Sequence, residues 1–278
     1  CDNFNESYHT RFVHPQVPSV IDQDHFTSRY EMFPKGHARI IQMGRPSLRD
    51  RIQEGEDHPF KMILEDWGID VDKYSDYETM SEQGWLDIKA AKRKLWKEKG
   101  YFHYENLSDE ELTESPFQFV FPNIAMGVQA DGCILLNWFP HPTDPEKCFF
   151  DLWDMGYPIG GSAKGIGKTG RDNDQKFTST SAGIGKKDKA NDQEFLSRTK
   201  VNPVKLQEVE LDFRDYDGGK GVEDLWDHVV YQDWQLTDGL RRGVRSKGYQ
   251  EPYLSSQETR VKYFHETLHD YLNGKPPR

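Results

Sequence analysis

The sequence predicts an α+β fold in which an antiparallel sheet curls around a helix. Strand-like runs are concentrated in the middle of the chain, and segments with helical periodicity flank them on both sides. The 278 residues include 7 Trp, 13 Tyr and 16 Phe, enough bulky side chains for a real core although only 35% of the residues are hydrophobic.

The N-terminal part is predicted to form a helix and then a pair of strands. An aromatic residue at every fourth position predicts a helix over residues 1–15 that Pro15 should close. The aromatic residues are Phe4, Tyr8 and Phe12. Residues 26–43 have strand-like composition and are broken at Pro34-Lys35-Gly36.

A polar, acidic stretch leads to a clearer helix over residues 85–99. Apolar residues recur there at helical spacing, and Gly100 provides a C-terminal stop. The outer face of this predicted helix is basic. It comprises Lys89, Lys92, Arg93, Lys94 and Lys97.

The middle of the chain is the most strand-like. Residues 117–121, 124–129 and 133–139 read as a meander, and the Ala130-Asp131-Gly132 turn is a strong hairpin signal. A further strand is predicted over residues 148–157.

Residues 158–200 are rich in small and polar residues, so we expect a long, mobile loop there. This stretch contains a short duplication, because the pattern of residues 165–177 recurs eighteen positions later. A strand near 204–213 follows, and then two helices over about 222–245 and 256–272. Ser255-Ser256-Gln257-Glu258 resembles a capping box at the start of the last helix.

Charge and cysteine content exclude several classes of function. Lys and Arg number 36 against 47 Asp and Glu, and this net charge of −11 argues against nucleic-acid binding. No apolar run approaches the ~20 residues that a membrane helix needs. Three cysteines without CxxC spacing, and no visible secretory leader, predict a cytoplasmic location.

Two histidines near the N-terminus are candidate metal ligands. His9 and His14 are five residues apart, so on an ideal helix their side chains would point about 140° apart. Joint binding requires the chain to leave the helix between them, which Pro15 favours because the residue before a proline avoids the α region. Glu6 could orient His9 by accepting its second N–H. Alternatively, both histidines are ordinary polar residues at a helix end.

A third ligand is indicated on the predicted helix 222–245. One face of this helix is apolar, but position 233 on that face is Asp. A buried carboxylate is costly unless it has a cation or a hydrogen-bonded partner. Together with the two histidines, Asp233 would complete the facial triad of non-haem Fe(II) sites. If the helix is misphased, Asp233 is simply exposed, and Asp227 and Asp238 are the alternative ligands.

Both ends of the chain resemble one family. The run Asp2-Asn3-Phe4-Asn5-Glu6-Ser7-Tyr8-His9, with His14, closely resembles the iron-binding segment of Rieske-type aromatic-ring-hydroxylating oxygenases, in the catalytic domain of the alpha (large) subunit. The C-terminal part is similar to the same family in Tyr231-Gln232-Asp233, Leu240-Arg241-Arg242-Gly243, Glu258 and Phe264-His265. The middle of the chain agrees only in general character.

The resemblance implies a helix-grip fold, a long curved antiparallel sheet around a C-terminal helix, with residues 1–278 as one mononuclear iron catalytic domain. It implies that His9, His14 and Asp233 bind Fe(II). Glu6 then stands at the position of the acidic bridge to the cluster of a neighbouring subunit, and Asn3 lies near the iron. The implied activity is hydroxylation of an apolar, aromatic small molecule with O2, by a monooxygenase or a dioxygenase.

The resemblance also implies electrons from a Rieske [2Fe-2S] cluster, supplied from NAD(P)H through a ferredoxin or a reductase. The CxH and CxxH pairs that hold such a cluster are missing from this sequence. We therefore expect the cluster on an upstream domain absent from the sequence, which starts at Cys1. A homotrimer is expected, with or without a small beta subunit. The basic face of helix 85–99 is either a docking surface for an acidic electron donor or simply solvated.

The substrate pocket is predicted to draw its walls from apolar residues that could equally be ordinary core. They are Phe119, Phe121, Met126, Val128, Leu135 and Trp138. Two other functions remain open on this sequence. One is a helix-grip module that binds a hydrophobic ligand without redox activity, and the other is a zinc hydrolase that uses the same three ligands.

Overall fold

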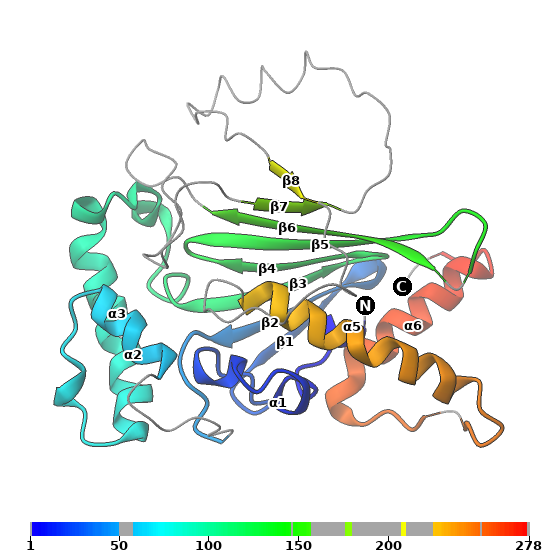
Figure 1. Cartoon of the computed structure of the whole chain (residues 1–278), viewed down its shortest axis with the longest axis horizontal. Coiled ribbons are helices and arrows are strands. Elements are labelled where there is room, and N and C mark those ends of the chain that lie inside the picture. The colour runs from blue at the N-terminus through cyan, green and yellow to red at the C-terminus, as the bar shows by residue number, and fades with distance from the viewer. Residues whose placement is uncertain are drawn as a thin grey trace, which may run out of the picture.

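The fold is built around an eight-stranded sheet (Figure 1). The computed structural model describes residues 2–49, 58–145, 147–156, 176–179, 207–209, 225–250 and 252–276. The strands lie in the order in which they follow along the chain. Neighbours are antiparallel from β1 to β7, whereas β7 and β8 are parallel. The predicted α+β class with an antiparallel sheet is therefore confirmed.

The described residues form eight strands and five α-helices, and the helices lie at one end of the sheet or across its face. The strands are β1 Arg29–Phe33, β2 His37–Met43, β3 Glu114–Val120, β4 Ile124–Gln129, β5 Gly132–Pro140, β6 Cys148–Gly156, β7 Lys176–Ser179 and β8 Gln207–Val209. The α-helices are α1 Thr10–Val13, α2 Pro59–Asp66, α3 Tyr77–Lys99, α5 Leu225–Val244 and α6 Thr259–Leu272. Figure 1 shows α2 and α3 at one end of the sheet, with α5 crossing in front of the strands.

Side chains alternate between the two faces of the central strands. The register places Phe119 opposite Ala125 and Ala125 opposite Leu136, so these three residues share one face. They form a core with Phe264 of α6, whose ring centroid is 5.2 Å from that of Phe119. α6 is thereby fixed on the face that also carries Val230 of α5.

The predicted meander is confirmed, and α3 is longer than predicted. β3, β4 and β5 are consecutive antiparallel strands with a turn at Ala130 and Asp131. α3 ends, as predicted, at Gly100, which has a left-handed φ of 83°. It begins at Tyr77, where the Asp76 side chain accepts the Thr79 N–H at 2.8 Å. The preceding polar stretch also contains α2, which the sequence pattern did not reveal, and both helices share a core.

The predicted helix over residues 1–15 is wrong. Residues 2–4 form one 3-10 turn, and α1 is a single turn from Thr10 to Val13. The three aromatic residues do not share a face, because Phe4 packs on Phe117 and Trp138 whereas Tyr8 and Phe12 are 44% and 77% exposed. Their spacing of four therefore does not reflect a helix.

The basic face of α3 is only partly exposed. Lys92 is buried, and its Nζ donates to Leu112 O at 2.8 Å and lies 3.2 Å from Asp131 Oδ2. Arg93 donates to Asp109 and to the carbonyl oxygens of Tyr104 and Leu107. Two of the five cations thus hold the end of α3 to neighbouring segments, which corrects the prediction of an outward basic face.

Several predictions concern residues outside those described. Most of the 158–200 stretch, including nearly all of the duplication, lies outside the described residues, and β7 is a strand within that stretch. β8 falls within the strand predicted near 204–213. The side chains of Asp227 and Asp238 are likewise not described.

The two C-terminal helices are confirmed. α5 and α6 lie within the predicted ranges, and the capping box forms with Glu258 Oε2 accepting the Ser255 N–H at 2.7 Å. None of the helices in the described residues is long and apolar enough to cross a bilayer.

We expect His58 to make the stability of the fold depend on pH. His58 is 3% exposed, and its Nδ1 accepts the Phe60 N–H at the start of α2. Burial lowers the pKa of His58 below its ordinary 6.5. Because the unfolded chain takes up this proton more readily than the folded protein, His58 contributes stability that is fully present above pH 6.5. This stability is lost as the pH falls through the pKa of His58 in the folded protein.

Urea unfolding at several pH values measures this contribution. His58→Asn retains a capping acceptor but cannot be protonated, so its unfolding free energy should fall less than that of the wild type between neutral and mildly acidic pH. Parallel pH profiles for the two proteins would refute the role of His58.

Candidate metal centre

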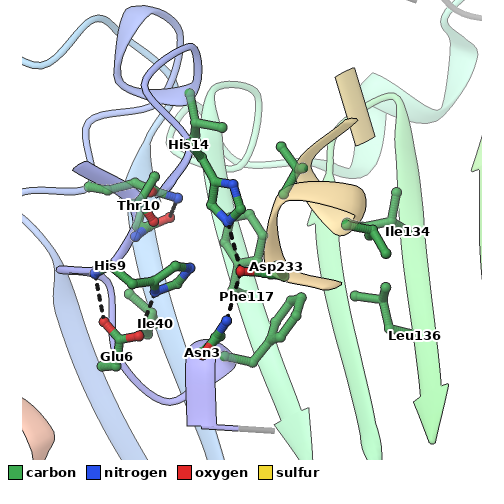
Figure 2. A pocket seen from close by; sticks show the side chains of 16 residues that line it. Asn3, Glu6, His9, Thr10, His14, Ile40, Phe117, Ile134, Leu136 and Asp233 are labelled. Carbon is green, nitrogen blue, oxygen red and sulfur yellow. Dashed lines mark hydrogen bonds and ion pairs between the residues drawn. The ribbon is translucent and has the colours of Figure 1, made fainter. Parts of the chain in front are cut away.

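The three predicted ligands meet in space. One ligand atom each from His9, His14 and Asp233 lie within 4.8 Å of one another. Figure 2 shows the two histidines on the N-terminal segment facing the carboxylate on α5. Residues more than 200 positions apart in the sequence therefore form one cluster.

The short α1 places both imidazoles on the same side. His9 precedes the helix, and His14 follows it with φ −121° and ψ 66°, outside the helical region and directly before Pro15. The ring centroids are 5.2 Å apart and the rings are nearly perpendicular. The chain therefore leaves the helix at the point that Pro15 predicts.

Each ligand side chain is held by a second residue. His9 Nδ1 is 2.5 Å from Glu6 Oε1, and the His9 backbone N–H donates to Glu6 Oε2 at 3.1 Å. Asn3 Nδ2 donates to Asp233 Oδ1 at 2.8 Å. Glu6 and Asn3, both candidates from the sequence, thus contact ligands directly.

The partner of His14 was missed by sequence reasoning. Gln232 Oε1 lies 2.8 Å from His14 Nδ1 and also accepts a hydrogen bond from Gln16 Nε2 at 2.8 Å. Its position next to Asp233 on α5 was the available signal, because consecutive residues at a helix edge can reach the same site.

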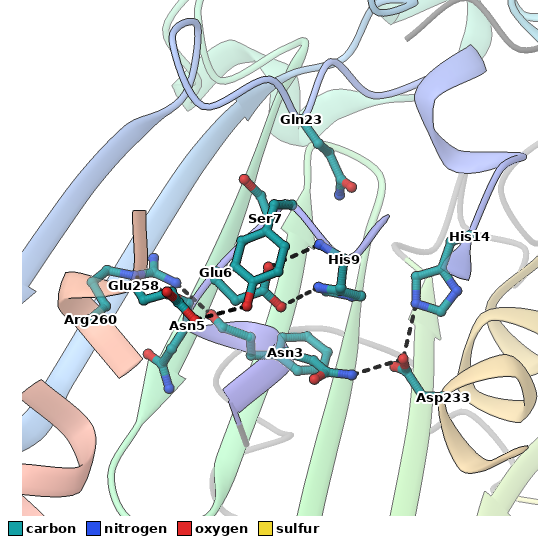
Figure 3. A network of polar contacts seen from close by, with 12 residues as sticks. Asn3, Asn5, Glu6, Ser7, His9, His14, Gln23, Asp233, Glu258 and Arg260 are labelled. Carbon is teal, nitrogen blue, oxygen red and sulfur yellow. Dashed lines mark hydrogen bonds and ion pairs between the residues drawn. The ribbon is translucent and has the colours of Figure 1, made fainter. Parts of the chain in front are cut away.

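Arg260 of α6 supports the segment that carries the ligands (Figure 3). It is 2% exposed and donates to Phe4 O at 2.7 Å and Asn5 O at 3.1 Å. Burial lowers the pKa of Arg260 to about 10, so the guanidinium stays charged at neutral pH. Its cation lies over the ring of Tyr30, whose own pKa is raised by burial.

The cluster fits a divalent cation. His14 Nε2 is buried, makes no hydrogen bond to a described residue and lies 3.2 Å from Asp233 Oδ1. Two ligand atoms that each lie about 2.1 Å from one ion, at a right angle to each other, would be about 3.0 Å apart. Two imidazole nitrogens and one carboxylate form the donor set of non-haem Fe(II) sites with open positions.

The expectation that the sequence lacks an HExxH segment, which gives the zinc-hydrolase alternative less weight, is wrong, but the segment that is present does not form a comparable site. Residues 265–269 match this zinc motif on α6, but His265 and His269 are exposed. His265 Nε2 contacts Asp2, and His269 contacts Asn273. Within the described part of the chain, His9, His14 and Asp233 form the only group of three potential ligands that converge.

A cavity of about 60 Å³ adjoins the ligands. Its apolar wall is formed by Phe4, Val17, Ile40, Phe117, Ile134, Leu136, Val229 and Val230. The side chains of Gln23 and Gln42 also line it and hydrogen bond to each other at 3.1 Å. For comparison, a core cavity that binds benzene measures ~150 Å³.

None of the six predicted pocket residues lines this cavity. The strand register puts Met126 and Leu135 opposite each other on the other face of the sheet, and alternation places Val128 there too. Phe119 and Phe121 pack against Phe264, and Trp138 packs against Phe4 and Phe150. The strands instead contribute Phe117, Ile134 and Leu136 to the cavity wall, because the side chains of these residues lie on the face of the sheet that α5 covers.

Fold and site together define an α+β protein with a cluster of two histidines and one carboxylate that could hold a metal ion. The family model described as "Ring hydroxylating alpha subunit (catalytic domain)" matches residues 1–156 and 206–274. The chain belongs to this family, as the resemblance in its sequence indicated, and is the catalytic domain of a ring-hydroxylating oxygenase. The family implies a non-haem iron site. No curated protein and no solved structure shows significant similarity to the chain.

Proposed function

We propose that the protein is the catalytic part of a terminal oxygenase that activates O2 at Fe(II) and hydroxylates an apolar, aromatic small molecule. The observation that carries this proposal is the convergence of His9, His14 and Asp233 beside an apolar cavity in a chain of this family. Its electrons come from a Rieske [2Fe-2S] cluster, reached through a ferredoxin or a reductase.

The proposed assembly follows from the same family. Residues 1–278 act as one catalytic domain with a helix-grip arrangement, in agreement with the position of α5 and α6 against the sheet. The protein works as a homotrimer, and the acidic side chain of Glu6 links His9 to the cluster of a neighbouring subunit.

The side chains around the site have separate tasks. When bound, iron supplies the reductive activation of O2. Glu6 accepts the Nδ1 proton of His9 and leaves Nε2 free to bind the ion. Asn3 donates to one oxygen of Asp233 and restrains the rotation of the carboxylate. The apolar wall excludes water and selects an apolar substrate.

Metal analysis after anaerobic loading with Fe(II) tests the proposal. We expect about one iron per chain, in keeping with one facial triad. His9→Ala should lose the iron, whereas His269→Ala, which removes an exposed histidine of the HExxH segment, should retain it. With a reduced Rieske donor and 18O2, the hydroxylated product should carry the isotope.

Two results contradict the proposal. A metal-free protein whose His9→Ala variant binds a hydrophobic ligand normally would be a binding module without redox activity. Hydrolysis by the zinc-loaded protein in the absence of O2 would instead identify a zinc hydrolase.

A further inference from the structure

The two histidine ligands are held by chemically different partners. His9 Nδ1 faces the carboxylate of Glu6 at 2.5 Å, whereas His14 Nδ1 faces the amide oxygen of Gln232 at 2.8 Å. A carboxylate can only accept a hydrogen bond at neutral pH, but an amide can present either an acceptor or a donor. The tautomer of His14 therefore depends on which end of the Gln232 amide faces the ring.

Gln16 is paired with that amide. Gln16 Nε2 donates to Gln232 Oε1 at 2.8 Å, and Gln232 Nε2 donates to Gln16 Oε1 at 3.4 Å. If the Gln232 amide alone turned over, its NH2 group would face both the NH2 group of Gln16 and the ring of His14. The reciprocal pair thus couples the two amides, and in the observed arrangement it directs the acceptor oxygen of Gln232 toward His14.

With Nδ1 donating its proton to Gln232, Nε2 of His14 carries the free lone pair. This atom is buried and directed at the Asp233 side of the site, 3.2 Å from Oδ1, without a hydrogen bond to any described residue. The opposite tautomer would place a proton at Nε2 and block metal binding there. Since Gln232 and Asp233 are consecutive, α5 brings both a ligand and the partner of another ligand to the site.

We propose that Gln232, oriented by Gln16, is a positioning residue that holds His14 in the Nδ1–H tautomer and prepares Nε2 to bind the metal. The proposal rests on the metal role of His14 proposed above. A neutral partner on His14 and an anionic partner on His9 make the two imidazoles unequal donors, because only the carboxylate raises the basicity of its ring strongly.

Titration of the purified, metal-free protein with Co(II) tests this role, since Co(II) reports ligand geometry in its visible spectrum and needs no electron donor. Gln232→Met keeps the length of the side chain but removes the acceptor, and should weaken Co(II) binding about 10- to 100-fold. Gln232→Glu restores an acceptor and should bind Co(II) at least as well as the wild type. Gln16→Met leaves Gln232 in place and should cause a smaller loss.

Gln235→Met is the matched control, because Gln235 is an exposed glutamine on the same helix whose side chain bonds only Tyr231 among the described residues. It should bind Co(II) like the wild type. Equal binding by Gln232→Met and the wild type would overturn the proposal. So would an equal loss in Gln232→Glu, which would show that packing rather than the acceptor matters.

A second measurement needs no metal. The 15N shifts of the His14 ring should report a proton on Nδ1 in the metal-free wild type and in Gln232→Glu, and a mixture of tautomers in Gln16→Met. A ring with a proton on Nε2 and none on Nδ1 in the wild type would overturn the proposal even if Gln232→Met failed to fold. A wild type with this tautomer that binds no Co(II) would instead contradict the proposed metal site and leave the tautomer assignment intact.

Discussion

Asp233→Ala is expected to abolish both iron binding and turnover. Loss of an outer hydrogen-bond partner typically weakens a metal site 10- to 100-fold, so loss of a ligand should cost more than about 100-fold in affinity. Asp233 is the sole contribution of α5 to the three converging ligands, and the two remaining imidazoles cannot form a facial triad.

Iron content and oxygenation rate measure this effect, with circular dichroism to verify the fold. Thr237→Ala is the matched control, because Thr237 is an exposed residue one turn further along α5 whose hydroxyl donates to Trp234 O. It should retain iron and activity. An Asp233→Ala protein that still holds one iron per chain would show that the cluster in the structure is not the metal site.

Two members of the converging cluster could be predicted because each one violates a local pattern. Asp233 interrupts an apolar helix face, and His14 directly precedes a proline that ends α1. Both irregularities are visible in one sequence. Gln232 breaks no such pattern. Its position next to Asp233 is a weak signal, because glutamines are also common on helix faces that only contact solvent.

The cavity wall could not be predicted because both faces of the central strands are apolar. Met126 and Leu135 on one face are as hydrophobic as Ile134 and Leu136 on the other. With apolar residues on both sides, alternation does not indicate which face is covered by α5 and α6. Only the packing of Phe264 and Val230 against the sheet identifies the inner face.

The strands were easier to place than the first helix for a related reason. The Asp131-Gly132 turn fixes the β4–β5 hairpin through local backbone preference. Phe4, Tyr8 and Phe12 instead have separate environments set by distant residues, which no local spacing reveals. The burial of Lys92 could not be predicted for the same reason, because a lysine on a helix is expected to face solvent unless its distant partner is known.

Asp131→Ala is expected to lower the free energy of unfolding by about 3–5 kcal/mol. Lys92 is 8% exposed, lies near the rings of Trp67 and Tyr104, and has Asp131 as its carboxylate partner. Removing the carboxylate leaves an uncompensated charge in an apolar setting, which is among the most costly changes to a folded protein. It also removes the acceptor of the buried Tyr104 hydroxyl.

Urea unfolding of four variants, Asp131→Ala included, separates the effect of the buried charge from the effect of packing. Lys92→Met keeps an apolar stem of similar length and leaves Asp131 bonded to Tyr104, so it should cost less than Asp131→Ala. Combining both substitutions should recover part of the Asp131→Ala loss, because the buried charge is then absent. Lys94→Ala, at an exposed position on the same helix, should change stability by no more than about 0.5 kcal/mol. A double variant as unstable as the sum of the two single variants would show that the charge pair does not hold the β4–β5 turn to α3.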